Sequence, residues 1–250
     1  MDRPLFSVIL PVRDAALTLP ATLASLLAQT LGDWEALVID DASTDGGLAR
    51  VRELAGSDRR LRLLGEGGAG PRGAAETRNI GIRAARGRHV AFLDSDDLWL
   101  PAKLERQAEA FADGATIVFS SYRRIDAEGR PLSVVRAAPR VAWDDALGGN
   151  PIGCLTAAYD TEAFGRAEMP LLPTRHDYAL WLRLLRTGAV AHGLPEVLAE
   201  YRVRPGSLSS NKLKGALAVW RLLGDEGVGP ARRTAGFARY AARSVVRRLT

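Results

Sequence analysis

The stretch LFSVILPV, from Leu5 to Val12, is a nearly continuous run of apolar and β-branched side chains. Such a run is typical of a strand in a parallel sheet that is covered on both faces. Leucines at helical spacing follow between Leu17 and Leu31, and a second apolar run extends from Glu35 to Ile39. Strand, helix and strand in this order predict the first unit of a parallel α/β sheet.

The same alternation continues to about residue 122 and then breaks down. The pattern predicts a helix to Ala55, a strand at Leu61 to Leu64, a glycine-rich loop at Gly65 to Gly73, a helix at Ala74 to Ala85, a strand at His89 to Leu93, a helix at Pro101 to Ala112 and a strand at Ala115 to Tyr122. We therefore expect an α/β fold with an open, mainly parallel, doubly wound sheet over residues 1–210. Helical patterns at 211–223 and 230–249 predict a C-terminal helical appendage over 211–250.

The amino-acid composition limits the classes of protein to which this chain can belong. Lys and Arg (34) outnumber Asp and Glu (29), and the net charge of +5 suggests acidic partners. No nucleic-acid-binding motif accompanies this charge, so we expect no nucleic acid partner. The single cysteine, Cys154, excludes an internal disulfide and a cysteine-rich metal site. No apolar run is long enough for a membrane span or signal peptide, so we expect a cytoplasmic protein.

Three polar clusters follow predicted strands: Pro11 to Asp14, Asp40 to Asp45, and Asp94 to Asp97. In doubly wound sheets, ligands bind at the carboxyl ends of the strands. The carboxylates of the third cluster repel one another, which suggests a cation there. Oxygen-rich sites favour Mg²⁺ or Mn²⁺. In the alternative interpretation, Ser95 or Asp97 caps the helix that follows Pro101.

Five segments occur in an order and spacing that resemble the family 2 glycosyltransferases of GT-A fold. They are SVILPVRDA (Ser7 to Ala15), VIDDASTDG (Val38 to Gly46), TRNIGIRAARG (Thr77 to Gly87), FLDSDDLWLPAKL (Phe92 to Leu104) and HDYALWLRLL (His176 to Leu185). Three other segments especially resemble small bacterial enzymes of cell-surface polysaccharide synthesis: IGCLTAAYD (Ile152 to Asp160), YRVRPGS (Tyr201 to Ser207) and SSNK (Ser209 to Lys212). The resemblance covers about Leu5 to Asn211. It implies a nucleotide-sugar-binding half at 1–112 and an acceptor half at 113–210.

Nucleotide-binding and metal-binding roles follow from the resemblance. Asp41 would hold the base, with a preference for uridine or thymidine, and Asp96 would be the direct ligand of Mn²⁺ or Mg²⁺ with Asp94 beside it. The other residues implied to bind nucleotide are Pro11, Val12, Arg13, Asp14, Asp40, Arg78, Asn79, Asp94 and Ser95. In the alternative interpretations, Asp40 to Asp45 form a capping and turn cluster, Arg78 is a surface residue and Asn79 makes local hydrogen bonds.

Asp177 matches the catalytic base of the family, which deprotonates the acceptor hydroxyl in an inverting reaction. His176 stands where the family commonly has Glu. The residues implied to contact the acceptor or the diphosphate are His176, Trp181, Arg202 and Arg204. Alternatively, Asp177 caps a helix whose Trp181 belongs to the core, and either arginine pairs with a carboxylate such as Glu200.

The resemblance implies an inverting, metal-dependent transfer from a nucleotide-sugar, expected to be a UDP-sugar, to a saccharide or lipid-linked acceptor. The last predicted helix separates apolar residues from Arg239, Arg243 and Arg247. This helix either lies on the inner membrane surface or docks on its own domain. Two other functions stay open: a non-catalytic scaffold in a synthase complex, and a phosphatase of the haloacid dehalogenase type with Asp94 as nucleophile. Leu98 stands where that phosphatase motif has Thr or Val.

Overall fold

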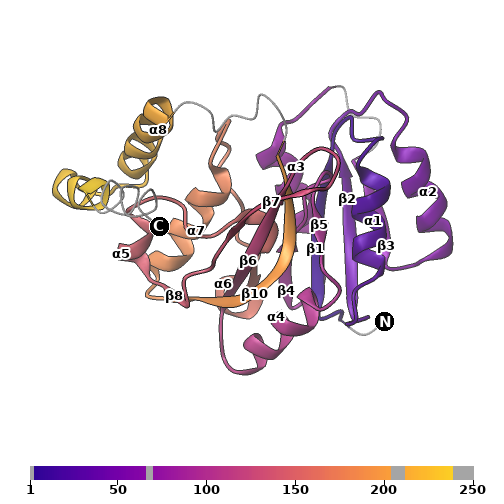
Figure 1. Cartoon of the computed structure of the whole chain (residues 1–250), viewed down its shortest axis with the longest axis horizontal. Coiled ribbons are helices and arrows are strands. Elements are labelled where there is room, and N and C mark those ends of the chain that lie inside the picture. Colours follow the sequence, from indigo (N-terminus) through magenta and orange to yellow (C-terminus); the bar gives the residue numbers. More distant parts are fainter. Residues whose placement is uncertain (1–2, 66–69, 204–211, 239–250) are drawn as a thin grey trace.

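The described residues form one ten-stranded sheet with helices around it (Figure 1). The computed structural model describes residues 3–65, 70–203 and 212–238. At the centre, β1 (Phe6–Val12) pairs in parallel with β2 (Trp34–Asp40) and β4 (His89–Phe92), and β2 pairs in parallel with β3 (Leu61–Leu64). The expected parallel α/β arrangement of the first half is confirmed.

The second half adds antiparallel strands to this sheet. The strand β9 (Ala158–Asp160) lies antiparallel between β4 and β6 (Ile117–Ile125), and β10 (Ala191–Arg202) runs parallel to β6. Three further short strands pair antiparallel at the periphery: β5 (Leu98–Trp99), β7 (Pro131–Val135) and β8 (Arg140–Val141). These short strands were not predicted, because two to five residues are too few to establish a period.

The helices cover both faces of the sheet and divide the core in two. Phe6, Val8 and Leu10 face one core, whereas Ile9 faces the other, as alternation along a strand requires. The helices are α1 (Leu19–Leu27), α2 (Leu48–Ser57), α3 (Ala74–Ala84), α4 (Lys103–Ala112), α5 (Trp143–Ala146), α6 (Thr161–Phe164), α7 (His176–Arg186) and α8 (Lys212–Asp225).

The first helix is shorter than the predicted span of 17–31. It begins at Leu19, next to Pro20, and Leu17 is 98% exposed before it. Beyond its end, the amide of Gln29 donates to the Leu100 carbonyl at 2.9 Å, and the Thr30 N–H donates to the Pro101 carbonyl at 2.9 Å. These bonds hold the chain in a non-helical path, so tertiary contacts override the leucine periodicity here.

Gly81 lets α3 pack closely on the sheet. A Cβ atom at this position would lie 2.8 Å from side-chain carbons of both Ile9 and Ile39. The absence of a side chain therefore brings α3 directly over β1 and β2. The close packing places the first turns of α3 beside the carboxyl ends of these strands.

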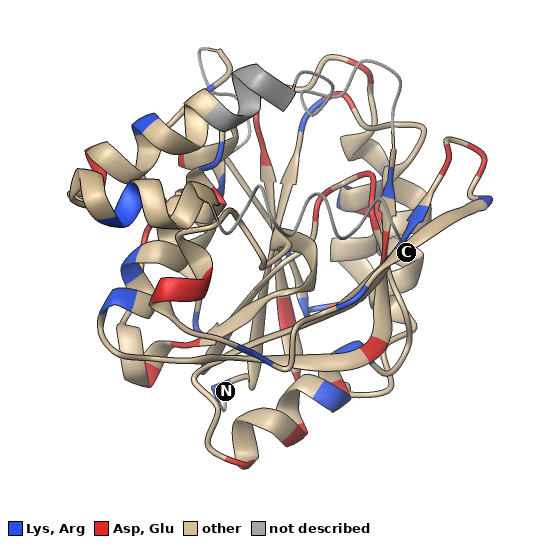
Figure 2. Cartoon of the chain, turned by 60° about the vertical axis from the view of Figure 1, so that its left-hand side comes forward, with Lys and Arg blue, Asp and Glu red and all other residues tan. Residues whose placement is uncertain are grey.

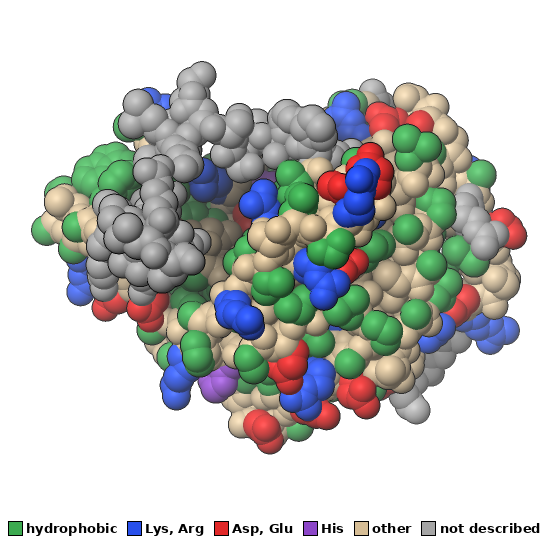
Figure 3. Space-filling model, viewed as in Figure 1, with side chains coloured by type: hydrophobic (Ala, Val, Ile, Leu, Met, Phe, Trp, Pro, Cys, Tyr) green, Lys and Arg blue, Asp and Glu red, His purple; other side chains and the backbone are tan. Residues whose placement is uncertain are grey.

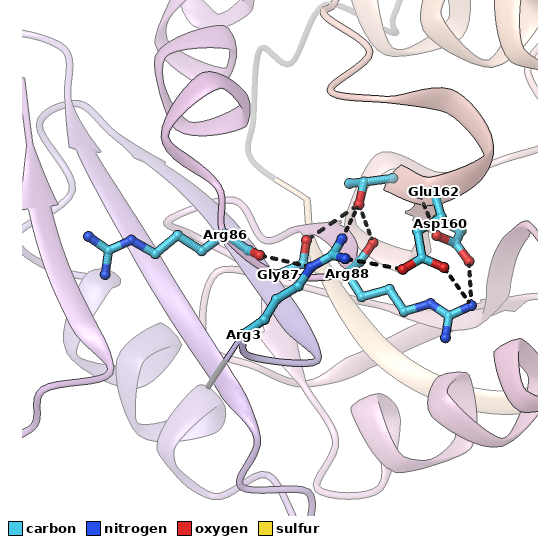
Figure 4. A network of polar contacts seen from close by, with 7 residues as sticks. Arg3, Arg86, Gly87, Arg88, Asp160 and Glu162 are labelled. Atoms are coloured by element: carbon cyan, nitrogen blue, oxygen red, sulfur yellow. Dashed lines mark hydrogen bonds and ion pairs between the residues drawn. The ribbon is translucent and has the colours of Figure 1, made fainter. Parts of the chain in front are cut away.

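Polar contacts tie the strands together near the N-terminus. Arg3 donates to the Arg86 carbonyl at 3.2 Å and pairs with Glu162 at 3.1 Å (Figure 4). Arg88 pairs with both Asp160 and Glu162, at 3.3 and 3.2 Å. Because Arg3, Arg88 and Glu162 are about half exposed, the pairs with Glu162 add little stability. Together they connect the segments before β1 and β4 to the start of α6.

The C-terminal helices pack on the domain. Leu222, Leu223 and Val228 are buried in the same core cluster as α7, and Arg183 pairs with Glu226 at 2.9 Å. Residues 230–238 are helical, and the rest of the expected basic helix, 239–250, lies outside the described residues. Within the described ranges, no helix is both long and apolar enough to cross a bilayer.

His89 predicts a pH dependence of stability. Its ring is 2% exposed and stacks on Phe111 at 3.8 Å, and burial lowers its pKa from 6.5 to about 4. The unfolded chain binds this proton below pH 6.5, whereas the folded chain does not until about pH 4, so stability falls across this window as pH falls. We expect His89→Phe to reduce the difference in unfolding free energy between pH 7 and pH 5, measured by urea titration. An unchanged difference would contradict this role of His89.

Candidate active site

A cavity of about 320 Å³ lies where the carboxyl ends of the central parallel strands meet. Val12 at the end of β1 is in register with Asp40 at the end of β2. The cavity is lined by Pro11, Val12, Arg13, Asp41, Gly73, Ala74, Thr77, Asp94, Ser95 and Asp96. Seven of these residues were singled out from the sequence, whereas Gly73, Ala74 and Thr77 were missed. The glycine-rich loop before α3 was the available signal for them.

Asp41 holds the start of α3 in place. Its carboxylate is 4% exposed, and its two oxygens accept the backbone N–H groups of Arg72 (2.5 Å) and Gly73 (3.2 Å). Gly73 has φ of +87°, a backbone conformation that favours glycine. Each carboxylate oxygen can accept a second hydrogen bond, so Asp41 retains capacity for a ligand. Asp40 does not line the cavity. Its Oδ1 accepts the Ser43 N–H at 3.0 Å instead.

Strained backbone gathers around this edge. Within the described residues, the non-glycine residues with positive φ are Asp14 (45°), Ala42 (62°) and Arg175 (62°). They follow β1, follow Asp41 and precede His176, and strained residues of this kind are frequent at functional sites. Asp14 does not line the cavity; its Oδ1 accepts the Thr44 N–H at 2.8 Å and so connects two loops.

The acidic cluster divides into two cavity-facing carboxylates and one buried carboxyl group. Asp94 and Asp96 line the cavity, whereas Asp97 is 1% exposed. Its Oδ1 accepts the Arg202 N–H at 2.9 Å. Burial raises the pKa of Asp97 well above its usual range, and the neighbouring Asp94 and Asp96 charges raise it further. Asp97 therefore has a structural position in the loop.

Arg202 supports the same loop from β10. Its Nε donates to the Asp96 carbonyl at 3.0 Å, and its Nη1 donates to the Ala127 carbonyl at 2.8 Å. This corrects the expected contact of Arg202 with diphosphate or acceptor, because its side chain is directed at backbone carbonyls. Glu200 pairs with Arg123 at 2.9 Å. Arg204 lies outside the described residues.

Arg78 connects the cavity to the start of α7. It is 7% exposed; its Nη2 pairs with Asp94 Oδ1, and its Nη1 lies 2.9 Å from His176 Nε2. Burial opposes the charge of Arg78, but Asp94, Cys154 and Asp177 together outweigh burial and raise its pKa overall. Burial and the Arg78 charge lower the pKa of His176. Since a guanidinium can only donate, Nε2 of a neutral His176 accepts this hydrogen bond.

Asp177 is half-buried in the first turn of α7. Its Oδ2 accepts the amide of Asn150 at 3.0 Å, a contact that the sequence did not suggest. In the space-filling view, the surface beside the strand-bearing part of the molecule is hollowed, and charged side chains are visible in the hollow (Figure 3).

Two predicted contact residues are packing residues instead. Trp181 is 0% exposed and packs edge-on against Phe92 at 5.9 Å, so it presents no surface to an acceptor. Asn79 is 1% exposed, and its side chain bonds the backbone N–H and carbonyl of Met169 at 2.7 and 2.8 Å. It therefore fixes the loop before α7 rather than contacting a nucleotide.

The residues at the cavity fit a divalent cation that completes its coordination from a substrate. Asp94 and Asp96 supply two carboxylates from one loop, and no group of three or more metal-ligating His, Cys, Asp or Glu occurs in the described part of the chain. Mg²⁺ is usually bound by one or two carboxylates together with water and substrate phosphates. This donor set suits Mg²⁺ or Mn²⁺ with a bound diphosphate.

Comparisons with solved structures agree with the fold. The structure of S. aureus TarS 1–349 with UDP-GlcNAc matches with a TM-score of 0.71 at 21% identity, over 94% of this chain and 71% of that one. The mannosyltransferase PcManGT from Pyrobaculum calidifontis, in complex with GDP-Man and Mn²⁺, matches with a TM-score of 0.72 at 23% identity, over 96% and 70%. The α/β domain thus has the GT-A fold, as expected.

Sequence comparisons give the family. The chain is 39% identical to the "Putative teichuronic acid biosynthesis glycosyltransferase TuaG" of Bacillus subtilis, over 99% of this chain and 98% of the relative. It is 35% identical to the Escherichia coli "UDP-Glc:alpha-D-GlcNAc-diphosphoundecaprenol beta-1,3-glucosyltransferase WfgD", over 90% and 87%. The family model "Glycosyl transferase family 2" matches residues 7–159. The chain therefore belongs to glycosyl transferase family 2.

Proposed function

We propose that this protein transfers a sugar, with inversion, from a UDP-sugar to a saccharide or lipid-linked acceptor in cell-surface polysaccharide synthesis. The observation that carries the proposal is the contact of Arg78 with both Asp94 and His176. This contact brings a nucleotide-sized cavity next to a carboxylate at a helix N-terminus. The similarity to TuaG and WfgD supports a role in cell-surface polysaccharide synthesis. WfgD, named as a glucosyltransferase that uses UDP-Glc, supports a UDP-sugar donor.

The donor site would use the strand-end residues for the base and the acidic loop for the diphosphate. Asp41 can accept the imide N–H of uracil, and the Arg13 guanidinium can stack on the base. Asp94 and Asp96 would hold Mn²⁺ or Mg²⁺, and the complex of PcManGT with GDP-Man and Mn²⁺ supports this assignment. The cation, when bound, offsets the charge that develops on the leaving diphosphate.

Asp177 would act as the base of the inverting step. The acceptor oxygen attacks the anomeric carbon as the bond to the diphosphate breaks, and Asp177 takes the hydroxyl proton. The amide of Asn150 holds Oδ2 of Asp177, so Oδ1 is the oxygen assigned to the proton. His176 contributes by holding Arg78 in place.

The proposed function also gives a role to each part of the chain. Residues 1–112 bind the nucleotide-sugar, 113–210 bind the acceptor, and 211–250 form the appendage. A lipid-linked acceptor would bring this protein to the cytoplasmic face of the membrane. Family membership does not favour a phosphatase, and the pairing of Asp94 with Arg78 leaves that carboxylate poorly suited as its nucleophile. A non-catalytic scaffold would need neither Asp96 nor Asp177.

The same substitution at Asp96 and at its neighbour Asp97 tests the donor site, with Asp97 as the control. We expect UDP to bind in the presence of Mn²⁺ and Asp96→Asn to weaken binding about tenfold or more, because a charged ligand is lost. Asp97→Asn should keep nearly wild-type affinity, since the buried amide can still accept the Arg202 N–H. Calorimetry with UDP, dTDP, GDP and CDP measures both effects. Equal losses in the two variants would contradict the division between Asp96 and Asp97.

Replacement of the proposed base separates chemistry from binding. Asp177→Asn should lower the transfer rate by about 10²-fold to 10⁴-fold, the range for a positioned general base. Its affinity for UDP should stay unchanged, because Asp177 does not line the donor cavity. Asn150→Ala is the control, with a smaller loss of rate. Full activity of Asp177→Asn with a UDP-sugar and a lipid-linked saccharide would exclude Asp177 as the base.

A further inference from the structure

A second cavity, of about 630 Å³, lies at the junction of α5, the end of α7 and the segment that follows α8. None of its lining residues belongs to the donor cavity. Its described lining combines two arginines and an indole with apolar and glycine residues, and contains no acidic side chain. The lining residues are Trp143, Arg186, Gly227, Val228, Gly229, Pro230, Ala231 and Arg232.

Positive charge is built into this cavity. The guanidinium of Arg186 lies 4.6 Å from the centre of the Trp143 ring, and its Nη2 donates to the Glu226 carbonyl. The Glu226 carboxylate is engaged by Arg183 at 2.9 Å, so it does not neutralise Arg186 directly. Arg232 is an exposed member of the lining. Figure 2, in which this side of the molecule comes forward, shows both basic and acidic residues on the nearby helices.

The helix α7 links this cavity to the proposed base. Asp177 is at its start and Arg186 at its end, which corresponds to about 14 Å along the helix axis. Residues 143–150 run beside it: the Tyr178 hydroxyl donates to the Ala146 carbonyl at 2.6 Å, and Asn150 donates to Asp177 at 3.0 Å. The helix α7 and residues 143–150 therefore connect the cavity to Asp177. An acceptor that contacts both the cavity and Asp177 must extend well beyond the hydroxyl group that receives the sugar.

We infer that this cavity binds the prenyl diphosphate part of a lipid-linked acceptor. The two guanidinium groups suit phosphate oxygens, since arginine forms strong, charge-assisted hydrogen bonds with phosphate. The exposed residues Pro230 and Ala231 offer an apolar surface to the first prenyl units. The inference rests on the proposed function, and it adds a site for the acceptor lipid that is separate from the donor cavity.

Binding of farnesyl diphosphate, a short soluble prenyl diphosphate, tests the inference on the full chain. We expect binding in metal-free buffer, measured by calorimetry, with much weaker binding of farnesol and of inorganic pyrophosphate. Arg232→Glu should weaken binding about tenfold or more, because an attractive charge becomes repulsive. Arg59→Glu makes the same charge change at the amino end of β3 and should leave binding unchanged. Ala231→Trp should also weaken binding by filling the cavity, with folding checked by circular dichroism.

Two results would overturn the inference: equal farnesyl diphosphate affinity in wild type, Arg232→Glu and Ala231→Trp, or no binding at all. Complete displacement by UDP with Mg²⁺ would place the probe in the donor cavity and would overturn it too. Failure of the proposed function is distinguishable, because it would appear as absence of UDP binding in the Asp96 experiment. UDP binding without farnesyl diphosphate binding would leave the transferase intact and remove only the lipid site.

Discussion

The buried guanidinium of Arg78 is the interaction on which the site depends. A buried cation costs several kcal/mol unless it is paired and hydrogen-bonded. Here Asp94 supplies the charge and His176 supplies an acceptor, so one side chain of α3 holds the acidic loop and the start of α7 together. Gly81 allows α3 to approach the sheet closely enough for this contact, and Asp41 fixes the residues before the helix. The donor and acceptor sides of the proposed site therefore share one support.

The first half of the fold was readable from sequence because its strands are long, apolar and separated by periodic helices. The positions of the strand-end residues followed from that topology, which is why Pro11, Asp41 and Asp94 were expected to lie near one another. The direction of individual side chains was not readable in the same way. Arg78 and Asn79 are consecutive on α3, yet one contacts Asp94 and the other contacts Met169. Adjacent helical residues point about 100° apart, and no local pattern says which one faces the cavity.

The second half was harder to predict for a physical reason. Its short strands β8 and β9 pair with strands distant in the sequence, and contacts between distant segments leave no periodic signal. Asn150 beside Asp177 and the cavity next to Trp143 both arise from such contacts. Arg202 and Trp181 match motifs of the family, but burial gives them supporting positions. A motif match therefore predicted the neighbourhood of these residues better than their contacts.

The pairing of β5 with β10 has a consequence for the order in which the chain acquires its structure. Leu98 and Trp99 pair with Glu200 and Ala199, and the loop that carries Asp96 is bonded to Arg202. During synthesis, the ribosome must therefore translate about a hundred further residues before the acidic loop has its final partners. The parallel strands β1 to β4 can associate earlier, since their contacts are more local. A nascent chain would thus build the sheet first and complete its acidic loop late, when the last strand arrives.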